Sequence, residues 1–298
     1  MSPQIPVKAL LIINPNSRQG AETSLDKGIE HLHQAGIEVE VVTAESPDES
    51  RKAIEKHQTE INLVILGGGD GTISSMAETL MDCKLTLAVL PLGTANDLAR
   101  SLGVADSLEA AFNAIIANHR QRIDLGRLNG HYFFNAAHIG LGVKVTEELT
   151  DENKKRWGVF SYLKALFAAL ARSDQFAVKM MVDGRSHRMR SIHLAVGNGR
   201  FYGGGNVIHK DARIDDRQLS VYSLKPQKLW KLLLLAPLLR SGGHQRHRRI
   251  FTATGAEIEV RTKRPMAIHA DGEPVCYTPA RFEVFPEALE AIVAVPTD

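Results

Sequence analysis

A regular alternation of short apolar runs and segments with helical spacing occupies the first 120 residues and constrains the fold most strongly. The apolar runs of strand length are residues 7–13, 37–43, 61–66 and 85–90. The segments with helical spacing that separate them are residues 21–36, 46–57, 72–81 and 107–118. Strands that are apolar along nearly their whole length, alternating with helices, predict a parallel sheet covered by helices on both faces.

From about residue 123 onward the pattern becomes a succession of short strands with turn residues between them. That spacing is typical of a β-sandwich or barrel. Two segments with helical spacing interrupt the strands, at residues 157–172 and 228–240. We therefore expect a Rossmann-like α/β N-terminal domain with a parallel sheet, residues 1–125, and a β-rich sandwich C-terminal domain, residues 126–298. The last few residues are expected to pack back on the first domain.

Charge and cysteine content exclude several classes of protein. The net charge is only +2, so composition gives no argument for a nucleic-acid partner, and none is expected. The two cysteines form neither a disulfide framework nor a metal-ligand spacing, which favours a reducing, cytoplasmic location. No apolar run reaches the roughly 18 residues that a membrane-spanning helix needs.

Three polar or glycine-rich loops follow predicted parallel strands. They are Asn14–Ser17, Gly67–Thr72 and Pro91–Asp97. The carboxyl ends of parallel strands meet at one edge of a sheet, where ligands bind in open α/β folds. Glycines let backbone N–H groups approach a phosphate, and the N-terminus of a following helix favours the same anion. The hydroxyl groups of Thr72 and Thr94 would add donors, so the sequence predicts a phosphate site.

Asp70 is the exception in this pattern, because a carboxylate repels a phosphate. Its presence is explained by a Mg²⁺ ion between the two, or by a role in ordering the loop through backbone hydrogen bonds. The residues leave both explanations open. A dinucleotide fingerprint is excluded because Thr72 stands where its last glycine should be, and no P-loop motif occurs in the chain.

The segments "GGGDGT" and "PLGTAND" together resemble the diacylglycerol kinase catalytic family, which includes sphingosine and ceramide kinases. The GGDGT part is shared with NAD kinases and 6-phosphofructokinases, whose type of α/β domain the resemblance therefore implies. Residues 123–142, 201–221 and 269–274 are similar to further segments of the family. The bacterial soluble lipid kinases are the members that this chain resembles most.

The resemblance implies a nucleotide site that holds the phosphates of ATP. The residues implied to form it are Asn14, Thr43, Gly68, Gly69, Asp70, Gly71, Thr72, Gly93, Thr94, Asn96, Asp97 and Asp124. Among them, Asp124 would join an acidic network in the cleft. The family often has Asn-Glu where this chain has Ser74-Ser75, at the start of the predicted helix.

The resemblance also implies the catalytic residues. Glu273 would be the general base that takes the proton of the lipid hydroxyl, if the second domain presents its turn to the γ-phosphate. Asp271 would lie beside it, and Asp70 would act with them. From the residues alone, "ADGEP" is also read as a plain hairpin turn, since Asp-Gly is the usual hairpin dipeptide.

A metal loop is implied as well. Asp216 would bind Mg²⁺, assisted by backbone carbonyl groups near Arg213 and Gln218, although Arg217 stands where the family usually has glycine. An acidic loop of this kind is also read as simply solvated. Residues 202–206 are read either as a phosphate-binding nest or as a flexible turn. His269 and Asp271 form an H-x-D pair that could bind a metal, but without a third nearby ligand His269 is read as a core histidine.

The expected function is an ATP- and Mg²⁺-dependent kinase that phosphorylates a lipid hydroxyl, with diacylglycerol as the first choice. NAD kinase is the alternative enzyme, and a non-catalytic lipid- or nucleotide-binding regulator is the alternative outside enzymes. The Leu-rich segment 228–240 and its basic tail to residue 249 suit a peripheral contact with an anionic membrane, or a helix packed on the sandwich. A homodimer is the expected assembly, if the protein assembles.

Overall fold

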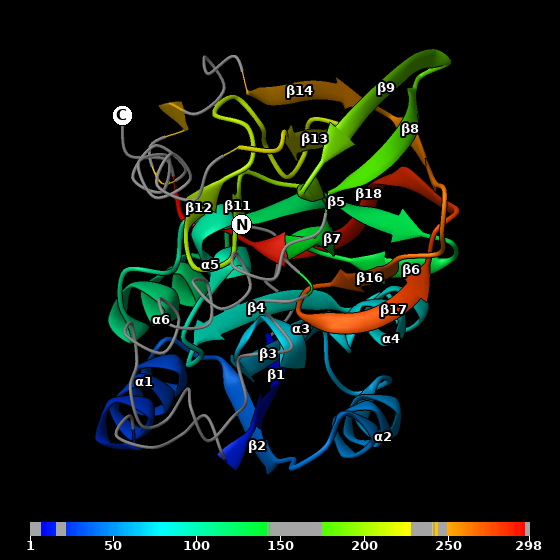
Figure 1. The fold of residues 1–298 in the computed structure, drawn as a ribbon. Helices are drawn as coiled ribbons and strands as arrows, with labels where there is room; N and C mark the ends of the chain where they lie inside the picture. Colours follow the sequence, from blue (N-terminus) through cyan, green and yellow to red (C-terminus); the bar gives the residue numbers. More distant parts are fainter. Residues whose placement is uncertain are drawn as a thin grey trace. The chain divides into compact units, whose positions relative to one another are not determined.

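The computed structural model describes residues 7–15, 22–141, 143, 175–227, 240, 242–243 and 249–295 (Figure 1). The chain divides into two compact units. Unit 1 comprises residues 1–125, 203–205 and 286–298, and unit 2 comprises residues 126–202 and 206–285. The strands β5 (Arg120–Leu128) and β18 (Ala280–Ile292) each contribute residues to both units.

Unit 1 is built on a parallel sheet with strands in the order β2-β1-β3-β4. These strands are β1 (Lys8–Ile13), β2 (Glu38–Thr43), β3 (Leu63–Gly68) and β4 (Thr86–Pro91). The C-terminal part of β18 continues the sheet beside β4, with Ala291 opposite Leu87. All six residues of β3 are buried, which is the burial expected of a central strand in a sheet with both faces covered.

Helices cover both faces of this sheet. They are α1 (Glu22–Gln34), α2 (Pro47–His57), α3 (Asp70–Ser74), α4 (Ala77–Asp82), α5 (Asp97–Ser101) and α6 (Leu108–Ala117). Helix α1 packs against α6, and α2 packs against α4 on the other side of the strands (Figure 1). Gly28 permits the first contact, because a Cβ atom there would lie 2.0 Å from the Phe112 ring. The Ser46 and Ser107 side chains cap α2 and α6, as their positions in the sequence predict.

The predicted helix over residues 72–81 was wrong in its extent. Two short helices, α3 and α4, occupy this region, and α3 already begins at Asp70 inside the glycine loop. The Ser75 hydroxyl donates to the Thr72 carbonyl oxygen at 2.8 Å, a local bond that competes with continued helix. Helix α5, which the periodicity of the sequence did not indicate, follows the PLGTAND loop.

Unit 2 is a sandwich of two antiparallel sheets. The first contains β18, β15 (Glu257–Thr262), β8 (Phe176–Val182) and β9 (Arg185–Ser191), with β5 and β6 (His131–Phe133) joined to β18. The second has the order β14 (Ile250–Gly255), β13 (Leu219–Leu224), β10 (His193–Gly197), β7 (Ala136–Gly140), β16 (Ala267–Ala270) and β17 (Glu273–Tyr277). A small pair, β11 (Phe201–Tyr202) and β12 (Asn206–Val207), stands apart from both.

The core of the sandwich comes from alternate residues of these strands. Val178, Met180 and Val182 of β8 are buried, as are Ile258 and Val260 of β15 and Phe282 of β18. Residues between them on the same strands face outward, so each strand shows the period of two that a half-buried sheet requires. The predicted fold class, a parallel α/β domain followed by a β-sandwich, is confirmed.

The two predicted helical segments after residue 126 fall almost wholly outside the described residues. Residues 157–172 are not described, and of residues 228–240 only Arg240 is. Among the helices that the structure describes, none combines the length and the apolar character needed to cross a membrane.

Candidate functional site

The parallel register of unit 1 brings three of its loops to one edge of the sheet. Ile13 at the end of β1 lies opposite Thr43 on one side and Gly67 on the other. On the next strand pair, Gly68 lies opposite Pro91. The Asn14 backbone N–H donates to the Gly67 carbonyl oxygen at 3.2 Å. The ends of these strands therefore meet at one edge, as the sequence predicted, and the structure gives their order as β2, β1, β3 and β4.

The loops after β3 and β4 touch each other backbone to backbone. A Cβ atom at Gly93 would lie 2.4 Å from the Cα atom of Gly69, so only glycine fits there. Asn96 holds the second loop closed in a left-handed conformation with φ 51°. Its side chain accepts from the Gly93 N–H at 2.9 Å and donates to the Gly93 carbonyl oxygen at 2.9 Å. Thr94 at the tip of this loop is exposed.

Asp70 joins the first loop to the helix that follows the second. One carboxylate oxygen of Asp70 accepts from the Asp97 N–H at 3.1 Å, and the other accepts from the Leu98 N–H at 3.0 Å. Asp70 thus satisfies backbone donors in the first turn of α5, where a negative charge is also favoured by the helix dipole. Of the two roles that the sequence left open, the structure shows the ordering of the loop.

Asp97 continues this chain of contacts. Its carboxylate accepts from the Gly204 N–H at 2.9 Å and from the Gly205 N–H at 2.7 Å, and the residue is only 4% exposed. The pKa of Asp97 is raised to about 6, mainly by burial and also by the nearby Asp70 carboxylate, while the two N–H donors and Arg100 lower it.

The glycine segment 203–205 is therefore a turn held by a carboxylate. Its three residues all have positive φ angles, 57°, 84° and 90°. Two of its N–H groups donate to Asp97, so they already have an acceptor and a bound phosphate is not needed to explain the turn. The sequence gave no signal of this contact, because Asp97 and Gly204 are 107 positions apart.

Asp124 lies on β5 and is 1% exposed. One of its carboxylate oxygens accepts from the Glu287 N–H at 2.8 Å. The neighbouring Arg122 donates to the Glu287 carbonyl oxygen at 3.1 Å. Asp124 thus fastens β5 to β18 inside unit 1, and its part in an acidic network with the nucleotide remains a prediction.

The "ADGEP" segment of unit 2 is a hairpin turn between β16 and β17. Asp271 and Gly272 occupy its two central positions with φ angles of 47° and 93°, the left-handed pair that a type I′ turn requires. The Glu273 side chain, at the first position of β17, is exposed. The hairpin reading made from the residues is therefore correct, and it does not exclude a catalytic role for Glu273.

Asp271 has a second function in this turn. Its carboxylate accepts three backbone N–H groups, from Phe134 at 2.7 Å, Asn135 at 2.9 Å and Ala136 at 3.1 Å. The Asp271 N–H in turn donates to the Ala136 carbonyl oxygen at 3.0 Å. The carboxylate therefore fixes the turn to the segment that enters β7, a partner that the sequence did not reveal.

The acidic loop of unit 2 is closed by its own hydrogen bonds. The two oxygens of Asp216 accept from the Arg213 N–H at 2.9 Å and the Gln218 N–H at 3.0 Å. Arg217 adopts φ 58°, the left-handed region that favours glycine, so the loop keeps this backbone shape without glycine. The Arg213 guanidinium pairs with Asp215 at 2.8 Å.

Within the described residues, no group of three or more His, Cys, Asp or Glu side chains is placed to hold a metal ion. A cation at Asp216 would therefore need backbone oxygens, as the prediction for this loop supposed. His269 is buried on β16 opposite His138 of β7. Burial, followed by the neighbouring His269, lowers the pKa of His138 to about 4, so His138 is neutral at physiological pH.

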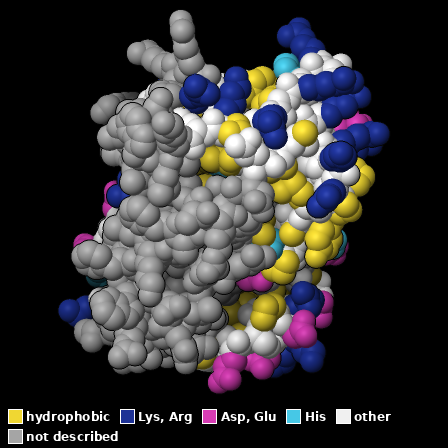
Figure 2. Space-filling model, in the orientation of Figure 1, with side chains coloured by type: hydrophobic (Ala, Val, Ile, Leu, Met, Phe, Trp, Pro, Cys, Tyr) yellow, Lys and Arg dark blue, Asp and Glu magenta, His cyan; other side chains and the backbone are white. Residues whose placement is uncertain are grey.

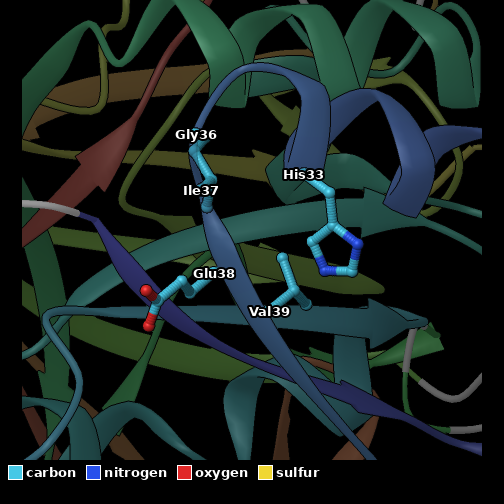
Figure 3. A pocket seen from close by; sticks show the side chains of 5 residues that line it. All are labelled: His33, Gly36, Ile37, Glu38 and Val39. Carbon is cyan, nitrogen blue, oxygen red and sulfur yellow. The ribbon is translucent and has the colours of Figure 1, made fainter.

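A hollow of about 430 Å³ in unit 1 lies away from the candidate loops (Figure 3). It is lined by His33, Gly36, Ile37, Glu38 and Val39. Glu38 and Val39 are the first residues of β2, whereas the candidate loops follow the last residues of the parallel strands. The hollow is thus at the opposite end of β2 from Thr43 and takes no part in the site.

Comparison with known proteins agrees with this arrangement. Residues 8–128 match the family model of the diacylglycerol kinase catalytic domain. Residues 136–293 match the model of the YegS C-terminal NAD kinase beta sandwich-like domain. A "Probable lipid kinase YegS-like" protein of Pseudomonas aeruginosa is 33% identical over 285 residues, which is 95% of this chain and 93% of the relative. A protein of the same description from Yersinia pestis is 29% identical and spans 94% of this chain and 95% of its own.

The solved structures give the same result for the fold. A crystal structure from Bacillus anthracis, described as a "putative diacylglycerol kinase", superposes with a TM-score of 0.83 at 25% identity and covers 99% of both chains. The fold of this chain, over nearly its whole length, is thus a known architecture. The chain belongs to the YegS-like lipid kinases of the diacylglycerol kinase catalytic-domain family.

Proposed function

We propose that this protein transfers the γ-phosphate of ATP to the hydroxyl group of a lipid, with Mg²⁺ as the metal and diacylglycerol as the first candidate acceptor. The observation that carries the proposal is the pair of glycine loops at the carboxyl edge of the parallel sheet, in backbone contact at Gly69 and Gly93. This feature accompanies membership of a lipid kinase family.

The residues of unit 1 fit the binding of a nucleotide triphosphate. Backbone N–H groups of the Gly68–Thr72 loop and the hydroxyl groups of Thr72 and Thr94 would donate to phosphate oxygens. Because Asn96 and Asp70 already fix the loops, little ordering is left to be done on binding. Such positioning is the larger part of catalysis in phosphoryl transfer.

Magnesium would neutralise the charge that the phosphates carry. The residues present fit this ion, since Asp70 and Asp97 offer carboxylate oxygens, the type of ligand that Mg²⁺ takes. Asp216 is the second candidate ligand.

Glu273 would hold the proton of the acceptor hydroxyl. An alcohol is a weak nucleophile at neutral pH, so a base within hydrogen-bond reach of its proton contributes typically about 10²–10⁴-fold to the rate. The exposed position of Glu273 on a rigid hairpin suits this role, because Asp271 fixes the turn without using the Glu273 carboxylate.

The test is an assay of phosphate transfer with labelled ATP and Mg²⁺. A total lipid extract, diacylglycerol, phosphatidylglycerol, a sphingoid base and NAD⁺ are offered separately, and the products are separated by thin-layer chromatography. We expect a labelled phospholipid from diacylglycerol and its loss when a chelator removes the metal. Labelling of NAD⁺ alone, or of no acceptor at all while ATP still binds, would contradict the proposal.

A further inference from the structure

The outer face of the β9–β8–β15 sheet in unit 2 carries an unusual row of like charges. Lys179 on β8 lies directly opposite Arg188 on β9 and directly opposite Arg261 on β15. All three side chains are exposed, Arg261 to 66%. Side chains directly opposite each other on antiparallel strands have Cβ atoms about 5 Å apart. These three residues, the cationic row, therefore hold three positive charges side by side across three strands.

The cationic row is costly for the folded protein. Like charges directly opposite each other on neighbouring strands destabilise a sheet. Among the described residues, neither Lys179 nor Arg188 has a carboxylate within ion-pair distance. The one partner of the row is Glu259, which lies 3.3 Å from Arg261 on the same strand. The sheet thus keeps a repulsion that ordinary surface substitutions would remove.

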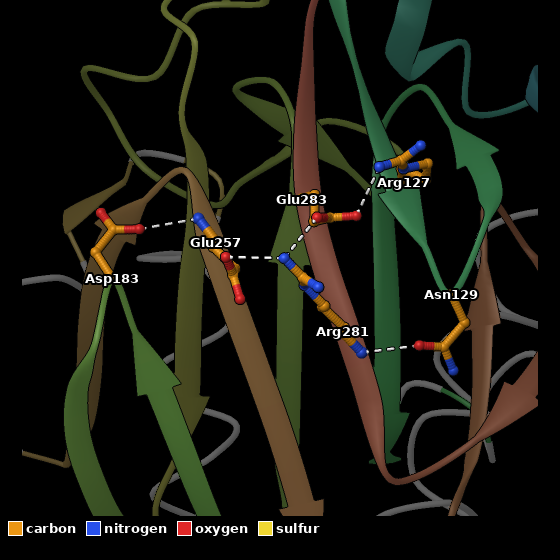
Figure 4. Close-up of polar contacts among 6 residues, drawn as sticks. All are labelled: Arg127, Asn129, Asp183, Glu257, Arg281 and Glu283. Atoms are coloured by element: carbon orange, nitrogen blue, oxygen red, sulfur yellow. Dashed lines mark hydrogen bonds and ion pairs between the residues drawn. The ribbon is translucent and has the colours of Figure 1, made fainter.

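The same face avoids this repulsion a short distance away (Figure 4). Glu257 and Glu283 are also directly opposite each other, on β15 and β18. There the Arg281 guanidinium bridges them, at 3.1 Å from Glu257 and 2.9 Å from Glu283. Arg127 of β5 pairs with Glu283 as well, at 2.8 Å. Opposite charges are therefore paired across strands at this place, whereas in the cationic row the described pair, Arg261 with Glu259, lies within one strand.

The surroundings of the cationic row suit an extended anionic partner. Arg190 continues the positive charge along β9, and it faces the same side as Arg188 because the two are separated by one residue. Figure 2 shows Lys and Arg side chains gathered over β8 and β9 with hydrophobic side chains beside them. Lys179, Met181, Glu259 and Arg261 line a shallow hollow of about 250 Å³ on this face.

We propose that this face docks on an anionic lipid bilayer, with the cationic row against the lipid headgroups and Met181 at the boundary. The net charge of the chain is only +2, so the attraction is local to this face. The choice of a bilayer over another polyanion rests on the proposed lipid substrate. The attraction itself rests on the charges alone, at about fivefold in affinity per Lys or Arg near such a surface.

The experiment measures flotation of the full-length protein with vesicles. Vesicles of phosphatidylcholine alone are compared with vesicles of equal parts phosphatidylcholine and phosphatidylglycerol. The test variant is Lys179→Gln, Arg188→Gln, Arg261→Gln, and the matched control is Lys27→Gln, Lys52→Gln, Lys56→Gln, which removes three exposed cations from α1 and α2. The control also corrects for the change in net charge.

We expect the wild type and the control to float with the phosphatidylglycerol vesicles only. The test variant should bind them on the order of a hundredfold more weakly, from three losses of about fivefold each. Salt at about 1 M should release the wild type, because the screening length falls to about 3 Å. Equal binding of the test variant and the wild type would overturn the proposal.

Two further measurements keep the result interpretable. The urea midpoint of the test variant should be no lower than that of the wild type, because the substitutions relieve a repulsion. Binding to a DNA duplex and to single-stranded RNA is measured at the same salt. If the substitutions weaken oligonucleotide binding and leave vesicle binding unchanged, the partner is a nucleic acid and the bilayer assignment is wrong.

Failure of this proposal is distinguishable from failure of the proposed kinase function. With diacylglycerol in detergent micelles, the test variant should phosphorylate as fast as the wild type. With diacylglycerol in anionic vesicles, its apparent KM should rise while kcat stays unchanged. Flotation needs no catalysis, so an inactive protein that still floats through the cationic row would overturn only the kinase proposal.

Discussion

The two turns that carry the candidate carboxylates, one in each unit, use aspartate in the same way and differ in the residue that remains available. In unit 1, Asp70 of the glycine loop accepts two backbone N–H groups from α5. In unit 2, Asp271 of the hairpin accepts three, from Phe134, Asn135 and Ala136. The glycine loop leads into a helix, whereas the hairpin leads to an exposed glutamate, Glu273.

The two aspartates therefore have a structural role in their turns, whereas Glu273 is available for a chemical role. A carboxylate that accepts several backbone N–H donors is held in place by those bonds and closes the loop that carries it. Glu273 is exposed at the start of β17 and is not needed to close the turn. The aspartates therefore mainly hold the loops, and the glutamate is the better candidate for a base.

Glu273→Gln is the substitution with the largest expected effect, and it tests whether Glu273 is the base. Glu273→Gln should lower the rate of phosphoryl transfer by about 10²–10⁴-fold, because the amide cannot take a proton. Its unfolding free energy should stay within about 0.5 kcal/mol of the wild type, as for other exposed positions. Steady-state kinetics and urea unfolding measure the two quantities, with Glu60→Gln as an exposed control. A variant that keeps full activity would show that the base is another group.

Asp271→Ala tests whether the aspartate holds the hairpin turn in place. Here we expect the main effect on stability, whereas Glu273→Gln should affect activity. The alanine substitution leaves three N–H groups without their acceptor, so we expect a loss of about 2–4 kcal/mol in unfolding free energy, discounted because the turn is partly exposed. Asp271→Asn should recover part of the loss, since its one carbonyl oxygen still accepts. Urea unfolding measures both. A loss below about 1 kcal/mol for the alanine variant would mean that the three hydrogen bonds do not hold the turn.

Asp70→Ala is expected to have a smaller effect on stability, because Asp70 accepts two donors and not three. We expect a loss of about 1–3 kcal/mol, the range for removal of a helix N-terminal acceptor with a charge. Phosphoryl transfer should be abolished while the protein remains folded, as checked by circular dichroism at the assay temperature. Full activity in a folded variant would remove Asp70 from the site altogether.

The sequence was sufficient to predict the elements that repeat a local pattern. Apolar runs predicted the parallel strands of unit 1, and the position of polar residues after those strands placed Asn14, Gly67 and Pro91 on one edge. The Asp-Gly dipeptide predicted the hairpin before Glu273. Each of these follows from residues close together in the chain.

The contacts that fix the site were not predictable in this way. Asp97 binds a glycine turn 107 positions away, and Asp271 binds Phe134 across 137 positions. A carboxylate that accepts backbone N–H groups needs no particular side chain at the donor, so the partner segment carries no signal in one sequence. For the same reason the sequence could not decide whether Asp70 orders its loop.

Asp97 makes the stability of the protein depend on pH, because burial raises its pKa more than its two N–H donors lower it. Its pKa is raised from 3.8 to about 6 in the folded protein, mainly by burial. An acid whose pKa is raised on folding contributes stability below its unfolded pKa, and this contribution disappears as the pH rises through the folded pKa. Relative to Asp97→Asn, which cannot titrate, the wild type should therefore lose up to about 3 kcal/mol between pH about 4 and about 7. Urea unfolding of both proteins across that range measures the difference. If the wild type gained stability relative to the variant instead, the hydrogen bonds from Gly204 and Gly205 would outweigh burial in setting the pKa of Asp97.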